Sequence, residues 1–339
     1  KRYKWTSSNP EVATVDEKTG LVTGISKGDA TIIVTADDFS SNPVSASCEI
    51  GVKIVTPITG MTFTEDTELN QLGYGQEYQI KYTLEPVDAT ASLLTWASDN
   101  PEVISVDKTG KLKVHTTKTA SAVITASYGP VVQNVTVTVA DGRFWYSLGN
   151  GLGNGLDNNW YLDGNNASVV SSDGNKTTVQ MGSGYRGDLW LARSGKGKIV
   201  NVTPADYRYF AIKVGFKSQL VPGKNKPNGC IKLEIFDDGI KKIGPEYFGT
   251  GGDANNRYEI LGASEISTTE PNVLYYDLQS KYKTVTPTDW NQVFDLVQCK
   301  FVIADFPETA QTYDLYWIRS FKSIEELQAF VDSENNTNE

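Results

Sequence analysis

The sequence predicts an all-β protein, in which two small β-sandwiches in tandem precede a larger jelly-roll-type β-sandwich with a short C-terminal helix. Three observations support this prediction. A tryptophan-led motif occurs twice in residues 1–140, short alternating strands separated by turns surround both copies, and longer alternating strands without a repeat fill the remainder. Glycine and tyrosine are abundant, at 30 and 17 of 339 residues, as is typical of turn-rich β-proteins.

The repeated motif begins at Trp5 and returns at Trp96, an offset of 91 residues. Residues 5–12 read WTSSNPEV and residues 96–103 read WASDNPEV, and each copy continues into Val-Asp and then Thr-Gly. A period of this length fits a whole small β-domain rather than one turn of a solenoid. The strand-like run before Trp96 has no counterpart before Trp5. We therefore expect a first domain at residues 1–55, incomplete at its N-terminus, and a second at residues 56–140.

The motif resembles the bacterial Ig-like group 2 domain. The shared pattern is Trp-x-Ser-x-Asn-Pro-x-Val-(Ala/Ile)-x-Val-Asp, then Thr-Gly, then Gly-x-Ala-Thr-Ile-x-Val-Thr-Ala, and residues 5–36 match it closely. The second copy departs after Gly110, where residues 115–120 replace the usual Gly-rich turn. The resemblance implies tandem Ig-like sandwiches that act as spacers or stalks on a secreted bacterial protein. The motif tryptophans are expected in the sandwich cores.

A different kind of sequence begins at Gly142, and we expect a single domain over residues 141–332. Residues 149–159 are rich in Gly and Asn and too polar for a core, so they predict a long surface loop. The strands beyond this loop are apolar on one face, which predicts two packed antiparallel sheets. The expected inward-facing residues are Phe210, Ile212, Val214, Phe216, Ile231, Leu233, Ile235, Leu274, Tyr276, Leu278, Phe301 and Ile303, and residues 313–321 are the expected last strand.

A helix is expected at the end of this domain. Ser323 and Glu326 have the spacing of a capping box, and Ile324, Leu327 and Phe330 recur on one helical face. The polar residues 333–339 that follow predict a disordered tail.

Composition excludes several classes of partner. The formal net charge of −10 argues against binding to nucleic acid or to an anionic membrane surface, since both need clustered Lys and Arg. Neither a signal peptide nor an apolar span of transmembrane length is visible. Cys48, Cys230 and Cys299 lack metal-ligand spacing, so they read as small buried hydrophobic residues, with a Cys230–Cys299 disulfide as an alternative.

Tryptophan is concentrated in the last domain, and aromatic rings suit the apolar C–H faces of sugars. Each candidate also has a structural interpretation, with Trp160 as a loop anchor, Arg186 and Asp188 as an ion pair, and Trp145 as a seal between domains. Trp290 and Trp317 are expected in the core, and Tyr247-Phe248 is an outside candidate. The predicted glycan-binding residues are Trp160, Tyr161, Trp190, Tyr185, Trp145, Arg186 and Asp188.

Catalysis and cofactors find little support in the sequence. His115 is the only histidine and lies in the second Ig-like domain, so a Ser/His/Asp triad has no suitable base. The acidic residues are scattered on turns, without an evident glycosidase pair, and we expect a non-enzyme without a cofactor. Oxygen ligands around Asp157, Asp163 and Asp173 leave a structural calcium ion open, although no EF-hand spacing exists and the metal stays unassigned.

Ig-like spacers followed by an aromatic-rich sandwich resemble the cell-surface glycan-binding proteins of Bacteroidetes polysaccharide-utilisation systems. Residues 314–327 look like the close of the C-terminal domain in that group. The resemblance implies an outer-membrane lipoprotein, with its signal and lipidation site outside this chain, that captures a polysaccharide as a monomeric binding unit near a transporter complex. Two alternatives stay open: an adhesin that binds a host protein, and the accessory module of an upstream glycoside hydrolase.

Overall fold

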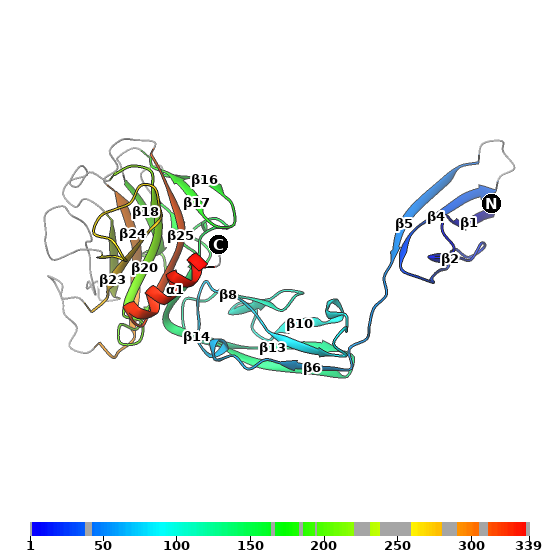
Figure 1. Ribbon diagram of the computed structural model, residues 1–339, viewed down its shortest axis with the longest axis horizontal. Coiled ribbons are helices and arrows are strands. Elements are labelled where there is room, and N and C mark those ends of the chain that lie inside the picture. The colour runs from blue at the N-terminus through cyan, green and yellow to red at the C-terminus, as the bar shows by residue number, and fades with distance from the viewer. Residues whose placement is uncertain are drawn as a thin grey trace. The chain divides into compact units, whose positions relative to one another are not determined.

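The computed structural model of the chain (Figure 1) describes residues 2–37, 43–163, 167–182, 186–193, 195–219, 231–237, 259–279, 290–304 and 311–336. These residues form two compact units. The first consists of residues up to 62 together with 83–93, and the second of residues 63–82 together with those from 94 onward. Strands dominate both units, and one short helix lies near the C-terminus, so the all-β prediction is confirmed.

The first unit contains the first copy of the motif. Its three-stranded antiparallel sheet has the order β1-β4-β5, from β1 (Arg2–Ser7), β4 (Gly28–Asp37) and β5 (Ser45–Val52). A second pair is formed by β2 (Ala13–Val15) and β3 (Val22–Gly24), and a third by β6 (Gly60–Phe63) and β9 (Tyr82–Glu85). The small core of the first copy consists of the buried residues Val12, Ala13 and Ala30, with Ile50 and Val52 packed beside them.

The second unit begins with most of the second Ig-like sandwich. One sheet has the order β10-β13-β14, with β7 also beside β14, and the other has the order β11-β12-β8. A 3-10 helix, η1 (Thr67–Asn70), precedes β7, and η2 (Ala91–Leu93) belongs to the first unit. The strands are β7 (Leu72–Tyr74), β8 (Glu77–Gln79), β10 (Thr95–Ser98), β11 (Ile104–Val106), β12 (Lys111–Val114), β13 (Ala120–Tyr128) and β14 (Val131–Ser147).

The structure explains why the motif joins a tryptophan to a distant Thr-Gly. Gly110 has φ +82°, and a Cβ there would lie 2.6 Å from Trp96 Cζ2. Gly20 repeats the arrangement, with φ +74° and a hypothetical Cβ 2.7 Å from Trp5 Cε2. Glycine is needed at both sites for its backbone conformation and for this close approach. Both tryptophans are half-buried against their sandwiches instead of completely enclosed.

The C-terminal sandwich has two facing sheets, as the alternating strands predict. The first runs β14-β25-β20-β23-β22, with the β16–β17 hairpin joined to β25, and the second runs β15-β18-β24-β19, with β21 also beside β24. The inward-facing residues predicted on β20, β21, β23 and β24 are all buried. The strands are β15 (Tyr161–Leu162), β16 (Ser168–Ser172), β17 (Thr177–Gln180), β18 (Arg186–Ala192), β19 (Val200–Val202), β20 (Tyr209–Phe216), β21 (Lys232–Asp237), β22 (Glu259–Ile260), β23 (Asn272–Asp277), β24 (Phe294–Ala304) and β25 (Thr312–Phe321).

The helix α1 (Ile324–Asn336) covers the outer face of the first of these sheets, near β20 and β25 (Figure 1). Ser323 accepts a hydrogen bond from the Glu326 backbone N–H at 3.2 Å, which confirms the expected cap. Trp317 is buried against this helix instead of between the sheets. The helix continues beyond Asp332, where a disordered tail was expected, because Glu334 accepts from Trp317 Nε1 and from Lys213 Nζ, both at 3.1 Å.

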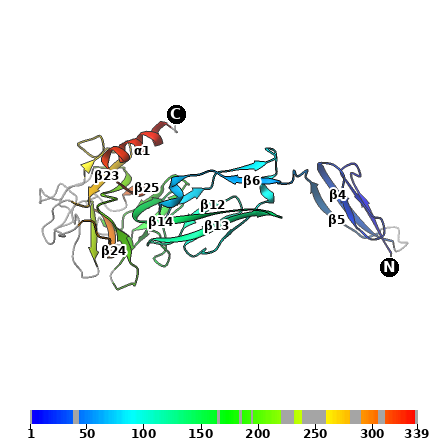
Figure 2. The same ribbon diagram turned by 90° about the horizontal axis from the view of Figure 1, so that it is seen from below.

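A single strand joins the second Ig-like sandwich to the C-terminal sandwich (Figure 2). Residues 131–139 of β14 pair with β13, and residues 145–147 pair with β25. Tyr74 Oη accepts from the Gly142 N–H at 3.2 Å, and Arg143 pairs with Glu68 at 2.7 Å. One hydrophobic core is continuous through both sandwiches. The domain boundary expected after residue 140, which stays a prediction, thus falls inside a strand.

The cysteines differ from the expectation. Cys48 is exposed on β5, because its strand position faces solvent, so it is not a buried hydrophobic residue. Cys299 is buried and free, which excludes the considered disulfide, and burial raises the pKa of its thiol. Cys230 lies outside the described residues.

Candidate functional site

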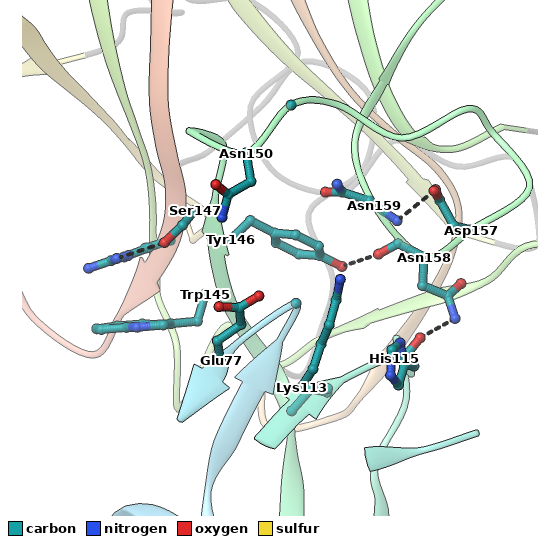
Figure 3. A pocket seen from close by; sticks show the side chains of 14 residues that line it. Glu77, Lys113, His115, Trp145, Tyr146, Ser147, Asn150, Asp157, Asn158 and Asn159 are labelled. Carbon is teal, nitrogen blue, oxygen red and sulfur yellow. Dashed lines mark hydrogen bonds between the residues drawn. The ribbon is translucent and has the colours of Figure 1, made fainter. Parts of the chain in front are cut away.

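A pocket of about 290 Å³ lies in the second unit, where the second Ig-like sandwich meets the C-terminal sandwich (Figure 3). Three segments of the C-terminal sandwich and two of the Ig-like sandwich line it, so both sandwiches contribute. The lining residues are Gly75, Glu77, Lys113, Val114, His115, Trp145, Tyr146, Ser147, Asn150, Gly151, Asp157, Asn158, Asn159 and Arg319.

The floor of the pocket is the end of β14, and Tyr146 fixes its shape. The Tyr146 ring is buried, with Trp160 and Phe144 as aromatic neighbours at centroid distances of 6.1 and 6.4 Å. Its hydroxyl donates to the Asn158 carbonyl at 3.0 Å, and burial raises the pKa of this phenol well above its ordinary value. Gly75 packs directly on the ring with φ +75°. Tyr146 is therefore a neutral, fixed support for the loop above it.

Trp145 and Arg319 form one wall, because β14 and β25 place them opposite each other in register. The Arg319 guanidinium carbon lies 4.4 Å from the Trp145 ring centroid, and the Arg143 guanidinium carbon lies 4.8 Å from it. Phe330 of α1 contacts the same indole in an edge arrangement, with the ring centroids 5.4 Å apart. Much of the Trp145 ring is thus already in contact with protein groups, and the half-buried remainder borders the pocket.

Arg319 has few polar partners for a largely buried cation. Its Nη2 donates to Ser147 Oγ at 3.4 Å, whereas its buried Nε has no hydrogen-bond partner in the described part of the chain. Among the described ranges, no carboxylate lies within ion-pair distance of its guanidinium. Burial lowers the pKa of Arg319 to about 10, because the charged form is poorly solvated there.

The Gly/Asn-rich segment forms the opposite wall. Asp157 accepts from the Asn159 backbone N–H at 3.3 Å, and the Asn158 side-chain amide donates to the carbonyl of His115. Lys198 Nζ donates to the Asp157 carbonyl. The bond from Asn158 to His115 thus ties the segment to the Ig-like sandwich. Asn150 extends its side chain beside Ser147 and Tyr146 (Figure 3).

Three polar side chains of the Ig-like sandwich complete the pocket. Glu77 is held by an ion pair with Lys111 at 2.5 Å. His115 Nε2 lies 2.7 Å from Ser105 Oγ, and burial lowers the pKa of His115, so its ring is neutral at pH 7. Lys113 is exposed, and its ammonium group points toward the Tyr146 hydroxyl (Figure 3).

The structure does not support Trp160 as a sugar platform. Its side chain is completely buried, with Phe301, Tyr146 and Phe210 as neighbours at centroid distances of 5.5 to 6.4 Å. The loop before it is polar, but the residue itself anchors that loop in the core, which was the structural alternative. Tyr161 next to it is half-buried, and β15 pairs it with Trp190.

Trp190 and Asp188 belong to a buried network of charges on the outer face of the second sheet of the C-terminal sandwich. Lys300 Nζ lies 3.2 Å from Asp188, 2.9 Å from Glu234 and 4.4 Å from the Trp190 ring centroid. Asp188 thus pairs with Lys300, while the side chain of Arg186, its partner in the ion-pair alternative, lies outside the described residues. Trp190 is only 8% exposed, so it offers little surface to a ligand.

The remaining predicted residues have varied positions. Arg186 lies on β18, but its side chain, Tyr185 and the Tyr247-Phe248 pair lie outside the described residues. Trp290 is half-buried against Phe294, with their ring centroids 6.2 Å apart. Of the described aromatic residues predicted to bind sugars, Trp145 alone borders the pocket. The roles of these residues in sugar binding stay predictions.

The oxygen ligands considered for calcium do not converge among the described residues. Asp163 pairs with Arg193, and Asp173 accepts backbone N–H groups from Asn175 and Lys176 in a turn. In the same part of the chain, no group of three or more His, Cys, Asp or Glu side chains is placed to hold a metal ion. Nor does any helix there have the length and apolar character needed to cross a membrane.

Sequence reasoning missed most of the pocket because it treated the sandwiches separately. Asn150, Asp157 and Asn159 lie in the loop that was expected to bind, whereas Lys113 and Arg319 were not singled out. No sequence pattern distinguishes Lys113 from the other lysines of the Ig-like repeat, or marks Arg319 within its aromatic strand. The two residues meet in the pocket because the continuous strand β14 joins the two sandwiches.

The fold and the pocket thus define a class of protein, all-β chains in which bacterial Ig-like sandwiches carry a larger jelly-roll-type sandwich with a polar pocket at their junction. The model of the family described as "Domain of unknown function (DUF4979)" matches residues 151–327, more than half of the chain, and the chain belongs to this family. Residues 1–45 match the bacterial Ig-like domain (group 2), which confirms that part of the resemblance.

A curated relative, an uncharacterized protein of Clostridium acetobutylicum, is 28% identical over 127 residues. The match covers 38% of this chain and 12% of that protein, so the chain spans only a small part of its length.

Several solved structures are also similar. Domains 4–9 of the surface layer protein SbsC are 16% identical, with coverage of 93% of this chain and 38% of that chain, at a TM-score of 0.22. A structure of carbohydrate-binding modules of the β-sandwich superfamily is 12% identical, with coverage of 95% and 98%, at a TM-score of 0.27. The Clostridium perfringens ZmpB catalytic domain with two carbohydrate-binding modules is 13% identical, with coverage of 95% and 28%, at 0.23. No functional conclusion rests on likenesses at these scores.

Proposed function

We propose that this protein binds a glycan, without modifying it, in the pocket between its second Ig-like sandwich and its C-terminal sandwich. The observation that carries this proposal is the composition of the pocket wall. The partly exposed ring of Trp145 borders the pocket together with amide groups and charged side chains. The charged side chains neutralise one another only in part. Sugars offer many hydroxyl groups and small apolar faces, and such mixed walls match both features. The volume of about 290 Å³ suits one sugar unit or a short stretch of a chain.

The carboxylates in the pocket support binding without catalysis. A glycosidase needs one carboxyl group that stays protonated to donate to the leaving group, opposite a second carboxylate. Glu77 instead forms an ion pair with Lys111 at 2.5 Å, and Asp157 is exposed on its loop. Both side chains are exposed, whereas the general acid of a glycosidase lies in apolar surroundings. In our proposal these groups orient hydroxyl groups and transfer no proton.

We further propose that binding takes place at a bacterial cell surface, with the Ig-like domains as spacers. The match of residues 1–45 to the bacterial Ig-like domain supports this setting. The resemblance to surface glycan-binding proteins of polysaccharide-utilisation systems supports the finer version, an outer-membrane lipoprotein beside a transporter. A pulldown from outer-membrane extracts with the complete gene product would test the association.

The binding proposal is tested by calorimetry of the whole chain against a panel of oligosaccharides. Asn150→Ala removes an amide that borders the pocket, and Asn134→Ala removes a matched exposed amide elsewhere on the Ig-like sheet. Loss of one or two neutral hydrogen bonds should weaken binding by about 2- to 10-fold. We expect that loss for Asn150→Ala and no change for Asn134→Ala. If no glycan binds the parent chain, the proposed function is wrong. If glycan binds and both variants behave alike, the site assignment is wrong.

A further inference from the structure

Within the described ranges, the two cations that line the pocket form no ion pair with its two carboxylates. Glu77 is neutralised by Lys111, which lies outside the pocket wall. Arg319 and Lys113 border the pocket, and neither forms an ion pair within the described ranges. The anion that remains, Asp157, lies on an exposed loop where water screens its charge. Glu334 of α1 acts on Arg319 only from beyond ion-pair distance, so the positive charge of Arg319 is incompletely compensated.

Arg319 is also held in one orientation. Its guanidinium carbon lies 4.3 Å from the Phe330 ring centroid, 4.4 Å from that of Trp145 and 5.4 Å from that of Trp317. Aromatic rings stabilise a guanidinium through its faces and leave its N–H edge for hydrogen bonds. Of the residues that the structure describes, only Ser147 accepts a hydrogen bond from that edge, through Oγ at 3.4 Å. The cation is thus fixed before any ligand arrives, which lowers the entropic cost of binding.

We propose that the pocket recognises an acidic sugar, in which the carboxylate of a hexuronic acid residue pairs with the Arg319 guanidinium. A carboxylate is planar and matches the guanidinium edge with two parallel hydrogen bonds. The exposed ammonium group of Lys113 adds positive potential at the pocket mouth. This inference rests on the proposed glycan binding and narrows it to anionic glycans. Sulfated sugars share the negative charge but are not planar, so the test below separates the two.

The net charge of the chain restricts the form of the ligand. At −10 overall, the protein repels a long polyanion, although screening limits this repulsion to about 10 Å at moderate ionic strength. Recognition must therefore come from the local pairing in the pocket. Short acidic oligosaccharides are the appropriate probes, since little of their charge extends beyond the pocket.

The experiment uses short oligogalacturonides and their methyl esters, in which each carboxylate has lost its charge and gained a methyl group. Calorimetry of the whole chain should show binding of the acid form at least about tenfold tighter than that of the ester, because a hydrogen bond between charged groups is worth about a decade or more in affinity. Arg319→Gln should abolish this preference, and Arg319→Lys should restore part of it. Lys113→Gln should weaken binding of the acid form alone, whereas Lys118→Gln, an exposed lysine away from the pocket, should change nothing.

The outcomes separate this inference from the proposed function. Equal binding of the acid and the ester refutes acidic recognition and leaves glycan binding intact, while tighter binding of a sulfated oligosaccharide refutes the carboxylate assignment. Absence of binding to any glycan refutes both proposals. If Arg319→Gln fails to fold, the comparison of Lys113→Gln with Lys118→Gln decides the matter, because both sites are exposed.

Discussion

Gly75→Ala should destabilise the second unit far more than an alanine at an equally unusual but open glycine. Gly75 has φ +75°, and a Cβ there would lie 2.2 Å from Tyr146 Cδ1 and 2.3 Å from Cε1. The ring cannot easily move away, because it is buried beside Trp160 and Phe144. Left-handed backbone at a residue other than glycine costs about 1–2 kcal/mol, and overpacking a core adds about 1–3 kcal/mol. We expect a loss of about 2–5 kcal/mol in the free energy of unfolding.

Gly129→Ala is the matched control for this substitution. Its φ is +54°, and nothing lies within 4 Å of a hypothetical Cβ, so only the backbone cost of about 1–2 kcal/mol applies. Urea unfolding of the whole chain, followed by tryptophan fluorescence, gives both values, and calorimetry with a bound glycan reports the pocket. Equal destabilisation by the two substitutions would refute the claim that Tyr146 is fixed in place.

Two further predictions concern the core and the response to acid. Trp160→Phe should lower the free energy of unfolding by about 1–3 kcal/mol and leave glycan affinity within about twofold, since the residue is a core anchor; a large loss of affinity without a loss of stability would contradict this. Burial of the Asp314 carboxyl opposes its ionisation, but Lys176 and Lys217, both at 2.8 Å, outweigh it and lower its pKa. Because its pKa is lower in the folded state, its contribution is present above about pH 4 and lost as pH falls further. Asp314→Asn should therefore reduce the loss of stability between about pH 5 and pH 2 in urea titrations, and an unchanged slope would contradict the assignment.

The fold was predictable because each of its elements leaves a local pattern. Alternating apolar residues on β20, β23 and β24 identified the inward face, and the structure buries all of them. Residues such as Ala211 and Val273 are buried on the opposite face as well, because α1 covers it. Alternation cannot show this second layer, since small apolar residues between large ones look like an ordinary exposed face.

The site was less predictable because the composition of the sequence does not distinguish a tryptophan in the core from a tryptophan on the surface. Trp160 follows a polar loop and so resembled a platform, yet the chain turns inward at that residue. Trp190 is buried and packs against Lys300 of β24, which is far away in sequence. The Gly/Asn-rich segment did indicate the position of the site, because its residues Asn150 and Asp157 line the pocket.

The junction also changes what the second Ig-like sandwich does in the proposed mechanism. A separate spacer would join its neighbour by a flexible linker, but β14 pairs with β13 at one end and with β25 at the other. The pocket takes Lys113 and His115 from one side and Asn150 and Arg319 from the other. A protein cut at residue 141 would therefore lose half of the strand and part of the wall. Because such a fragment lacks the complete site, a failure of binding by it would say nothing against glycan recognition, and the unit to test must retain both sandwiches.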